Sequence, residues 1–345
     1  MSRGNINYRY LKRRKNWFQR NWKRLLLLLI ILLLAAGIVT GVILAKRSGG
    51  FTNMFSKKDQ DRSEVQTETQ QEAKEVVWID DKEPVSNKVE YTAPADVKLP
   101  YTIKVNRAMN CATVYGIDQT GNYSIPVKAF ATSCGREGQE TIVGENYSTT
   151  DKYVWRLMVD GTYGHYANRI YGGYLFHSVP YLSSTNDSLE TAEYNKLGSY
   201  ASLGCVRMCV RDVLWLYENC PEGTKVTIYD DNTTPGPLGK PESIKIPENS
   251  PNAGWDPTDP AEGNPWSSMS AQIVGAKDIT TKVGQKVNLL DGVTATDTCG
   301  NDITSKIVTV GHYTFDREGE YDIKYKVTDA IDRTAEVTVK LKVTK

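Results

Sequence analysis

The side chains best suited to nucleophilic chemistry in this sequence are six cysteines and three histidines. Cys205 lies in the run SLGCVR at residues 202–207, where Gly204 allows the backbone close to a ligand and successive N–H groups can face a developing oxyanion. A free thiol has a pKa of about 8.5 and is only slightly ionised at neutral pH, so a catalytic cysteine needs a base. Residue types alone leave each cysteine open to a plainer interpretation, that of a small buried hydrophobe.

Histidine is the natural base for such a thiol, and the three histidines differ in their surroundings. His177 ends the apolar run GYLFH, which has the pattern of a β-strand that could hold an imidazole rigidly. His165 lies in the run GTYGHY, which is typical of a loop, and His312 belongs to the last part of the chain. We therefore predict His177, rather than His165, as the base.

The remaining cysteines limit the possible disulfides and metal sites. Cys209 and Cys220 flank a predicted helix that would hold them about 16 Å apart, which is too far for a bridge. A disulfide between Cys111 and Cys134 on neighbouring strands stays open. Cys205 and Cys209 have CxxxC spacing but no further ligands nearby, so we predict no metal and no other cofactor.

The elements that must position these residues are mostly β-strands. Short runs with strand-like patterns, separated by Gly, Asn and Asp, predict strands at 101–106, 112–115, 125–132, 154–159, 173–177 and 225–229. Two helices are predicted, one over 187–196 with Asp187 as its N-cap and one over 211–219. Together these elements predict a β-rich domain over residues 97–230.

The cysteine run and the run FHS at 176–178 together resemble the signature of the YkuD-type L,D-transpeptidase family. Supporting matches are Leu197-Gly198 ahead of the cysteine run and ATSCG at 131–135, at the end of an early strand. The similarity covers about residues 97–230. It implies a β-rich catalytic fold that cross-links the stem peptides of peptidoglycan.

Carried over to this sequence, the resemblance implies Cys205 as the nucleophile, His177 as the general base and Ser178 as a residue whose backbone or side chain orients the imidazole. Backbone amides around Gly204 and Cys205 would form the oxyanion hole. Arg207 would contact substrate or brace the loop. The residues implied on the oxyanion and substrate side are Ser202, Leu203, Gly204 and Arg207.

Two features depart from the family pattern. Leu203 stands where the family usually has a histidine, which removes a side chain beside the oxyanion hole without removing a backbone donor. The interval between His177 and Cys205 is also long, and we predict that the extra residues, roughly 181–200, form a lid over the cleft.

The reaction that the resemblance implies is acyl transfer through a cysteinyl thioester, which yields a 3–3 cross-link between two stem peptides. Water in place of the second stem would make the same site an L,D-carboxypeptidase, and the sequence leaves both outcomes open. The rival from another class is a non-catalytic wall-binding or adhesion protein, and Leu203 is the feature that favours it.

The N-terminus predicts a membrane anchor. Nine Lys or Arg residues and no acidic residue occupy 1–24, and 25–45 carries no charged side chain. As a helix, 25–45 would be about 31 Å long, close to the thickness of a bilayer core. Because basic flanks stay cytoplasmic, we predict a single-pass protein of the cell membrane with its catalytic domain outside; a cleaved signal peptide is the alternative. The net charge of +1 provides no overall field for nucleic acid.

Composition divides the rest of the chain. Residues 46–96 are rich in charged and polar side chains and predict a flexible stalk, and the Pro-, Asn- and Gly-rich residues 231–271 predict a linker. Alternating strands over 272–345 predict a small β-sandwich. Its run GEYDIKYKVTD at 319–329 resembles bacterial Ig-like repeats of surface proteins, so its partner would be a wall component or another protein.

Overall fold

The computed structural model describes residues 77–79 and 87–345, all within the compact unit Gln71–Lys345. The predicted basic segment 1–24, the predicted membrane helix 25–45 and most of the predicted stalk lie outside the described residues. Within the described part, no helix is both long enough and apolar enough to cross a membrane.

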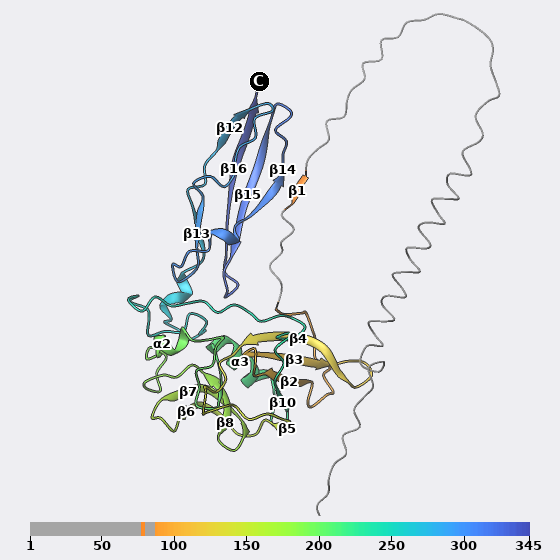
Figure 1. Cartoon of the computed structure of the whole chain (residues 1–345), viewed down its shortest axis with the longest axis vertical. Coiled ribbons are helices and arrows are strands. Elements are labelled where there is room, and N and C mark those ends of the chain that lie inside the picture. Colours follow the sequence, from red (N-terminus) through yellow and green to blue (C-terminus); the bar gives the residue numbers. More distant parts are fainter. Residues whose placement is uncertain (1–76, 80–86) are drawn as a thin grey trace, which may run out of the picture. The chain divides into compact units, whose positions relative to one another are not determined.

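The first sheet of the β-rich domain has the strand order β4-β3-β2-β10-β5 (Figure 1). Its strands are β2 Tyr101–Asn106, β3 Cys111–Ile117, β4 Tyr123–Ala131, β5 Gly144–Ser148 and β10 Lys225–Tyr229. The long-range partner β10 runs parallel to β2, with Lys225 opposite Thr102. The predicted apolar face of β2 is buried, but Thr102 and Asn106 on the other face are buried as well. The Asn106 amide is satisfied there, because it donates to two backbone carbonyls after β10.

The second sheet carries the residues of greatest chemical interest and has the order β6-β7-β8-β9. Its strands are β6 Lys152–Leu157, β7 Tyr163–Tyr171, β8 Tyr174–Ser178 and β9 Val206–Met208. Helix α3, Val210–Asn219, follows β9 after one residue. Both sheets and α3 contribute side chains to one core, including Ile103, Phe176 and Leu216. The predicted mostly-β fold is confirmed, as are helix 211–219 and strand 225–229.

The predicted helix over 187–196 is wrong in extent, because α2 covers only Thr191–Tyr194. The residues ahead of α2 are tied to other segments through their backbones: Leu189 N–H donates to the Gly254 carbonyl and Glu190 N–H to the Pro180 carbonyl. Asp187 does not cap the helix and accepts a hydrogen bond from Thr185 Oγ1 instead. These tertiary partners compete with helical hydrogen bonds and shorten the helix.

Two segments that composition assigns to the stalk and the linker pack onto the β-rich domain where the structure describes them. Tyr91 lies against the core and donates its hydroxyl hydrogen bond to the Ile117 carbonyl. Ile244, Ile246 and Trp266 are buried in a second apolar cluster. The predicted linker is therefore packed in part, because a few apolar side chains anchor a segment whose average composition is polar.

The C-terminal part, with β1 added from the N-terminal side, forms a further set of strands with its own core. Its five-stranded sheet has the order β1-β14-β15-β16-β12, and β11 pairs with β13. The strands are β1 Val77–Ile79, β11 Gln272–Val274, β12 Ile279–Lys282, β13 Thr294–Thr296, β14 Val308–His312, β15 Gly319–Thr328 and β16 Thr334–Thr344. The alternation in β15 and β16 is confirmed, since Ile323, Tyr325 and Leu341 are fully buried.

All six cysteines carry free thiols. The disulfide between Cys111 and Cys134 that the sequence leaves open is therefore not formed. Burial raises the pKa of both thiols to about 11, which keeps them protonated and poorly nucleophilic at neutral pH.

Candidate active site

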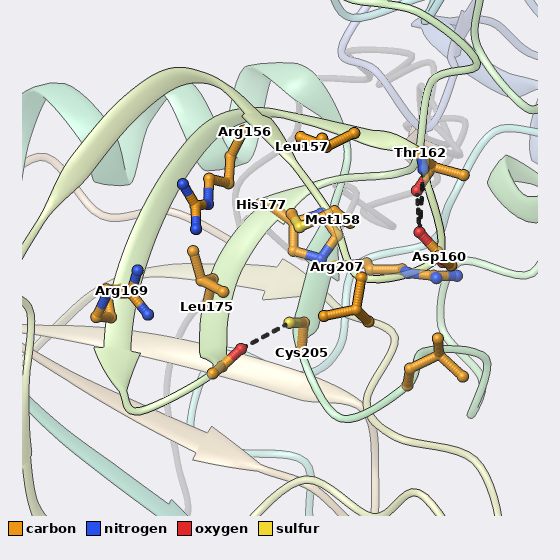
Figure 2. Close-up of a pocket in the computed structure, with 13 residues that line it drawn as sticks. Arg156, Leu157, Met158, Asp160, Thr162, Arg169, Leu175, His177, Cys205 and Arg207 are labelled. Carbon is orange, nitrogen blue, oxygen red and sulfur yellow. Dashed lines mark hydrogen bonds between the residues drawn. The ribbon is translucent and has the colours of Figure 1, made fainter.

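One pocket opens at the second sheet and contains both Cys205 and His177 (Figure 2). The hairpin between β6 and β7 forms one wall, and the ends of β8 and β9 form the other. The lining residues are Arg156, Leu157, Met158, Val159, Asp160, Thr162, Arg169, Gly173, Leu175, His177, Leu203, Cys205 and Arg207.

Parallel pairing of β8 with β9 brings the two reactive side chains to this pocket. In the register, Phe176 lies opposite Val206 and His177 opposite Arg207. Cys205 immediately precedes β9 and lies two residues before Arg207, the partner of His177 in the ladder. The Cys205 thiol donates a weak hydrogen bond to the Gly173 carbonyl, with Sγ 3.7 Å from the oxygen. Cys205 and His177, which are far apart in the sequence, are thus brought to the same pocket.

The His177 imidazole is buried and uncharged. Burial lowers its pKa to about 3, and the Arg207 guanidinium acts in the same direction, while the Ser178 backbone carbonyl and Asp160 act against them. His177 Nδ1 is buried and lacks a hydrogen bond of good geometry among the described residues. An imidazole that is neutral at pH 7 can accept a proton, so it meets the first requirement of a general base.

The Cys205 thiol is half-buried, and burial raises its pKa above the ordinary value. The Leu175 backbone N–H and the Arg207 guanidinium oppose that rise. The resting site is therefore a neutral thiol beside a neutral imidazole. Proton transfer must accompany attack on a substrate, because little thiolate is present beforehand.

The turn before Cys205 is fixed by Ser202 and Gly204. Ser202 is buried, and its Oγ donates to the Cys205 carbonyl (2.5 Å) and accepts from the Gly204 N–H (3.1 Å). Gly204 has φ +119°, and a Cβ there would lie 2.9 Å from Cε1 of Tyr174, so only glycine suits this position. The Gly204 N–H is occupied by Ser202 and does not point freely into the pocket.

Gly164 on β7 makes room for the histidine. A Cβ at this position would lie 2.9 Å from His177 Nδ1 and 2.4 Å from Cε of Met158. The methionine end can move aside, but the imidazole is held in a buried strand. The absence of a side chain at Gly164 therefore sets the position of the ring.

Substituting Gly164 with alanine is expected to lower the acylation rate of Cys205 about 100-fold while the strands stay formed, because a shift of the imidazole misaligns the proton transfer. Stopped-flow acylation and circular dichroism measure the two effects. Thr338→Ala, at an exposed position on β16, is the control. Equal acylation rates in Gly164→Ala and the parent would show that the ring position is not critical.

Arg207 lines the pocket and is held in place by the inserted segment, residues 181–200, and by the residue that follows it. Its Nη1 donates to Glu193 Oε2 (2.8 Å) and, more weakly, to the Ala201 carbonyl (3.4 Å). None of residues 181–200 lines the pocket, so the predicted lid is not observed. Tyr181 and Tyr194 are fully buried in the second apolar cluster, which holds the insert down against the domain.

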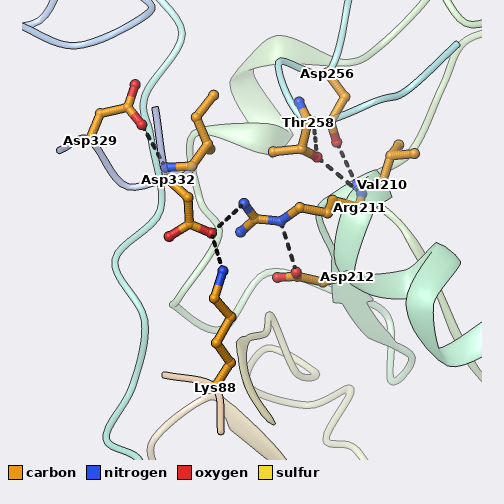
Figure 3. A network of polar contacts seen from close by, with 9 residues as sticks. Lys88, Val210, Arg211, Asp212, Asp256, Thr258, Asp329 and Asp332 are labelled. Atoms are coloured by element: carbon orange, nitrogen blue, oxygen red, sulfur yellow. Dashed lines mark hydrogen bonds and ion pairs between the residues drawn. The ribbon is translucent and has the colours of Figure 1, made fainter. Parts of the chain in front are cut away.

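The helix that follows β9 is anchored by Asp256 (Figure 3). The Asp256 carboxylate is buried and accepts hydrogen bonds from the Val210 N–H (2.7 Å), at the first residue of α3, and from Thr258. It therefore caps the helix from a distant segment. Burial raises the pKa of this carboxyl group to about 6.

Alanine at Asp256 is expected to reduce the free energy of unfolding by about 1–2 kcal/mol, because the first turn of α3 loses its cap. Asp256→Asn keeps an acceptor and should lose less. Urea unfolding followed by far-UV circular dichroism measures both variants, with the exposed Asp316→Ala as control. A parent-like midpoint for Asp256→Ala would contradict the capping role.

The turn between β15 and β16 meets the start of the same helix (Figure 3). Arg211 Nη1 and Lys88 Nζ lie 3.3 Å and 3.5 Å from Asp332 Oδ2. Asp332 adopts a φ of +68°, which is uncommon for a residue other than glycine. Ile331 from this turn is buried in the second apolar cluster. The contact thus combines apolar burial with exposed ion pairs, and the burial is the larger stabilising term.

Not every residue that the sequence implicates lies in the pocket. Cys205, His177, Leu203 and Arg207 line it, whereas Ser178, Ser202 and Gly204 lie outside its lining. Ser178 Oγ accepts from the His165 N–H and donates to the Val179 carbonyl, so its hydroxyl supports β7 and β8 and makes no hydrogen bond to the imidazole.

His165, the other candidate base, is buried outside the pocket. Its ring stacks between Trp155 and Tyr166, with centroid distances of 3.9 Å and 3.8 Å. Burial lowers its pKa to about 4, so it is neutral at pH 7.

Sequence reasoning missed the wall formed by the hairpin between β6 and β7. Arg156, Asp160 and Arg169 line the pocket and bring charge to it. The signal available in the sequence was the turn run VDGT at 159–162 between two strand-like runs. That signal predicts a hairpin, but only the tertiary packing shows that the hairpin faces Cys205.

Comparisons with known proteins identify two domains. Residues 100–228 match the YkuD family, described as the L,D-transpeptidase catalytic domain, and residues 271–343 match the bacterial surface protein Ig-like domain. The chain therefore contains a YkuD-type catalytic domain and a bacterial Ig-like domain. Both resemblances predicted from the sequence are confirmed.

One curated relative is YciB of Bacillus subtilis (strain 168), which its name assigns to the L,D-transpeptidases. It is 34% identical over 115 residues, which are 33% of this chain and 50% of that protein. The chain thus spans about half the length of this relative.

Solved structures with similarity include two L,D-transpeptidases. The one from Mycobacterium smegmatis is 15% identical, with a TM-score of 0.31 over 37% of this chain and 58% of that chain. The one from Mycobacterium tuberculosis H37Rv is 21% identical, with a TM-score of 0.29 over 38% of this chain and 58% of that chain.

Proposed function

We propose that this chain, through its YkuD-type catalytic domain, is a peptidoglycan L,D-transpeptidase that forms 3–3 cross-links through a thioester on Cys205. The observation that carries the proposal is the shared pocket of Cys205 and His177 within the residues that match the family. A neutral thiol beside a buried neutral imidazole has the protonation states that nucleophilic attack with general-base assistance requires.

In the first step, Cys205 Sγ attacks the carbonyl carbon of the diamino acid at position three of the donor stem. The thiol proton passes to the His177 imidazole as the C–S bond forms. The tetrahedral intermediate then collapses, the C–N bond to the terminal D-Ala breaks, and the imidazolium returns the proton to the departing amine. The products are a thioester on Cys205 and free D-Ala.

In the second step, the side-chain amine of an acceptor stem attacks the thioester carbonyl. The new C–N bond forms, the C–S bond breaks, and one proton of the amine returns to the sulfur through His177. Attack by water in place of the amine would give a free tripeptide, which is the L,D-carboxypeptidase outcome. Which nucleophile prevails depends on acceptor binding outside the pocket.

The developing oxyanion needs donors from the turn at 202–205. Since the Gly204 N–H donates to Ser202 Oγ, we assign the principal role to the Cys205 N–H, with Ser202 fixing the turn that aims it. Leu203 lines the pocket as an apolar side chain in place of the usual family histidine. We expect this difference to change rate and substrate preference and to leave the reaction type unchanged.

A defined-substrate assay tests the proposal. The full-length chain is incubated with a disaccharide-tetrapeptide donor alone and with a tripeptide acceptor, and products are resolved by liquid chromatography and mass spectrometry. A 3–3 linked dimer that requires the acceptor supports the transpeptidase. Tripeptide as the sole product assigns the carboxypeptidase, and an unchanged donor would favour the non-catalytic wall-binding protein.

For the whole chain we propose a single-pass membrane protein with residues 1–24 cytoplasmic, 25–45 spanning the membrane and the catalytic domain outside. The charge asymmetry of the sequence supports this orientation. We further propose that the boundaries 46–96, 97–230, 231–271 and 272–345 delimit stalk, catalytic domain, connecting segment and Ig-like domain, whose partner would be a wall component or a protein. Protease added to intact protoplasts should degrade the Ig-like domain; protection would contradict the orientation.

A further inference from the structure

The charges of the pocket are unevenly compensated. Three arginines and one aspartate line it: Arg156, Arg169, Arg207 and Asp160. Figure 2 shows the guanidinium groups of Arg156 and Arg169 on one side of the pocket, near Leu175, and Asp160 with Arg207 on the other side. The pocket therefore has a cationic side, and the partners of each arginine decide how much of that charge is available to a ligand.

Two of the three arginines form ion pairs and hydrogen bonds within the protein. Arg169 Nε donates to Asp151 Oδ2 (2.7 Å), and its other nitrogens donate to the Gly172 carbonyl and the Tyr153 hydroxyl (3.1 Å). Arg207 is paired with Glu193 at 2.8 Å and is almost fully buried. These side chains shape the pocket and hold its strands, and their charges are largely compensated.

Arg156 is the exception among the residues that the structure describes. It is exposed on β6, lines the pocket, and forms no ion pair or hydrogen bond with another described side chain. Its guanidinium lies over the Tyr153 ring, 4.9 Å from the centroid, which restrains the side chain without neutralising its charge. The five donors of a guanidinium remain available for a planar anion.

We propose that Arg156 binds the free α-carboxylate at the C-terminus of the donor stem peptide. This inference rests on the proposed function and specifies how the substrate is recognised. The leaving D-amino acid carries its carboxylate one carbon away from the scissile nitrogen. A substrate whose scissile carbonyl lies at Cys205 therefore places that carboxylate within the same pocket, where Arg156 offers the one uncompensated cation of its described lining.

The expected specificity follows from this pairing. A guanidinium binds a carboxylate through two parallel hydrogen bonds, and the interaction in a partly exposed pocket should favour an acid over the isosteric carboxamide by about 10- to 50-fold. The preference should decrease at high salt, because the pocket is open to solvent. A stem whose C-terminus is amidated, or extended by a further residue, would lose this contact.

The test separates binding from chemistry. Dissociation constants are measured by calorimetry for a tetrapeptide ending in a D-Ala carboxylate and for the same peptide ending in a carboxamide. The protein is the full chain carrying Cys205→Ala, which cannot turn the peptides over. We expect the acid to bind about 10-fold or more tightly than the amide, Arg156→Gln to abolish that ratio without weakening the amide, and Arg156→Lys to retain part of it.

The exposed Arg317→Gln on the Ig-like domain is the matched control and should leave the ratio unchanged. Equal affinity for the two peptides, or an acid preference that survives Arg156→Gln, would overturn the inference, as would the absence of binding by either peptide. Acylation of the unsubstituted chain by the acid peptide is measured separately. Acylation without an Arg156-dependent preference would refute the carboxylate site alone, and its absence would refute the proposed function.

Discussion

Replacing Cys205 with alanine is expected to reduce acyl transfer by on the order of 10⁴-fold or more, because no other described side chain of the pocket can form a thioester. The fold should survive. The thiol is half-buried, and its hydrogen bond to the Gly173 carbonyl is weak. Release of D-Ala from a tetrapeptide donor measures the rate, and the far-UV circular dichroism spectrum checks the fold.

Cys299→Ala is the control for this experiment. Cys299 is buried in the second apolar cluster, outside the pocket, and its removal should lower stability without lowering the rate. Incubation with a carbapenem, which acylates a reactive cysteine, gives a second readout by intact mass. If Cys205→Ala released D-Ala or gained the adduct mass like the parent chain, the nucleophile would lie elsewhere.

Substituting His177 with glutamine is expected to lower the rate about 10²- to 10⁴-fold at pH 7 and to change the shape of the pH profile. The direction of the pH dependence follows from the pKa shifts of His177 and Cys205. Burial lowers the pKa of His177 to about 3, so the base is neutral from about pH 4 upward, and burial raises the pKa of Cys205 above the ordinary value. The reactive pair of neutral thiol and neutral imidazole is therefore fully populated across pH 5–8, and the parent rate should be nearly flat there.

Without the imidazole, only the thiolate can attack, and its fraction rises with pH. The rate of His177→Gln should therefore increase about tenfold per pH unit between pH 6 and 8, as long as the pH stays below the raised pKa of the thiol. Steady-state D-Ala release at constant ionic strength measures both profiles, with the exposed His312→Gln as control. A parent profile that falls below about pH 6.5 would mean that the imidazole is solvated in the working enzyme and the buried geometry is not the active one.

The sequence predicts regular elements well where a single periodicity dominates. The strands β15 and β16 alternate cleanly because one face is buried, and α3 follows from its apolar stripe. The predicted helix at 187–196 has a good local capping pattern, yet the chain uses the backbone of Leu189 and Glu190 to reach Gly254 and Pro180. Such partners come from distant segments, and no local pattern reports them.

Prediction of the site is limited for the same reason, namely that contacts between distant segments leave no local pattern in the sequence. A motif implicates Cys205 and His177, and the parallel register of β8 with β9 brings them to one pocket. Arg156 and Gly164 come from the neighbouring hairpin, where their residue types are unremarkable in sequence. Their importance arises from what they face, namely the pocket for Arg156 and the His177 ring for Gly164.

Composition misleads in the segments that connect the domains. A polar, proline-rich stretch predicts a chain that stays in solvent, but Asp256 caps α3 and Trp266 is buried beside the inserted segment. A few well-placed side chains offset the ordering cost of a long irregular segment, and average composition hides them.

Peptide mapping of the acyl-enzyme tests the central claim most directly. The full chain is mixed with a tetrapeptide donor, quenched in acid within the first turnover and digested, and the modified peptide is sequenced by mass spectrometry. We predict the mass of the tripeptidyl group on Cys205, accumulating in the parent chain and far more slowly in His177→Gln. A tripeptidyl group on any other residue, or product release with no acylated Cys205 at any time, would contradict the account.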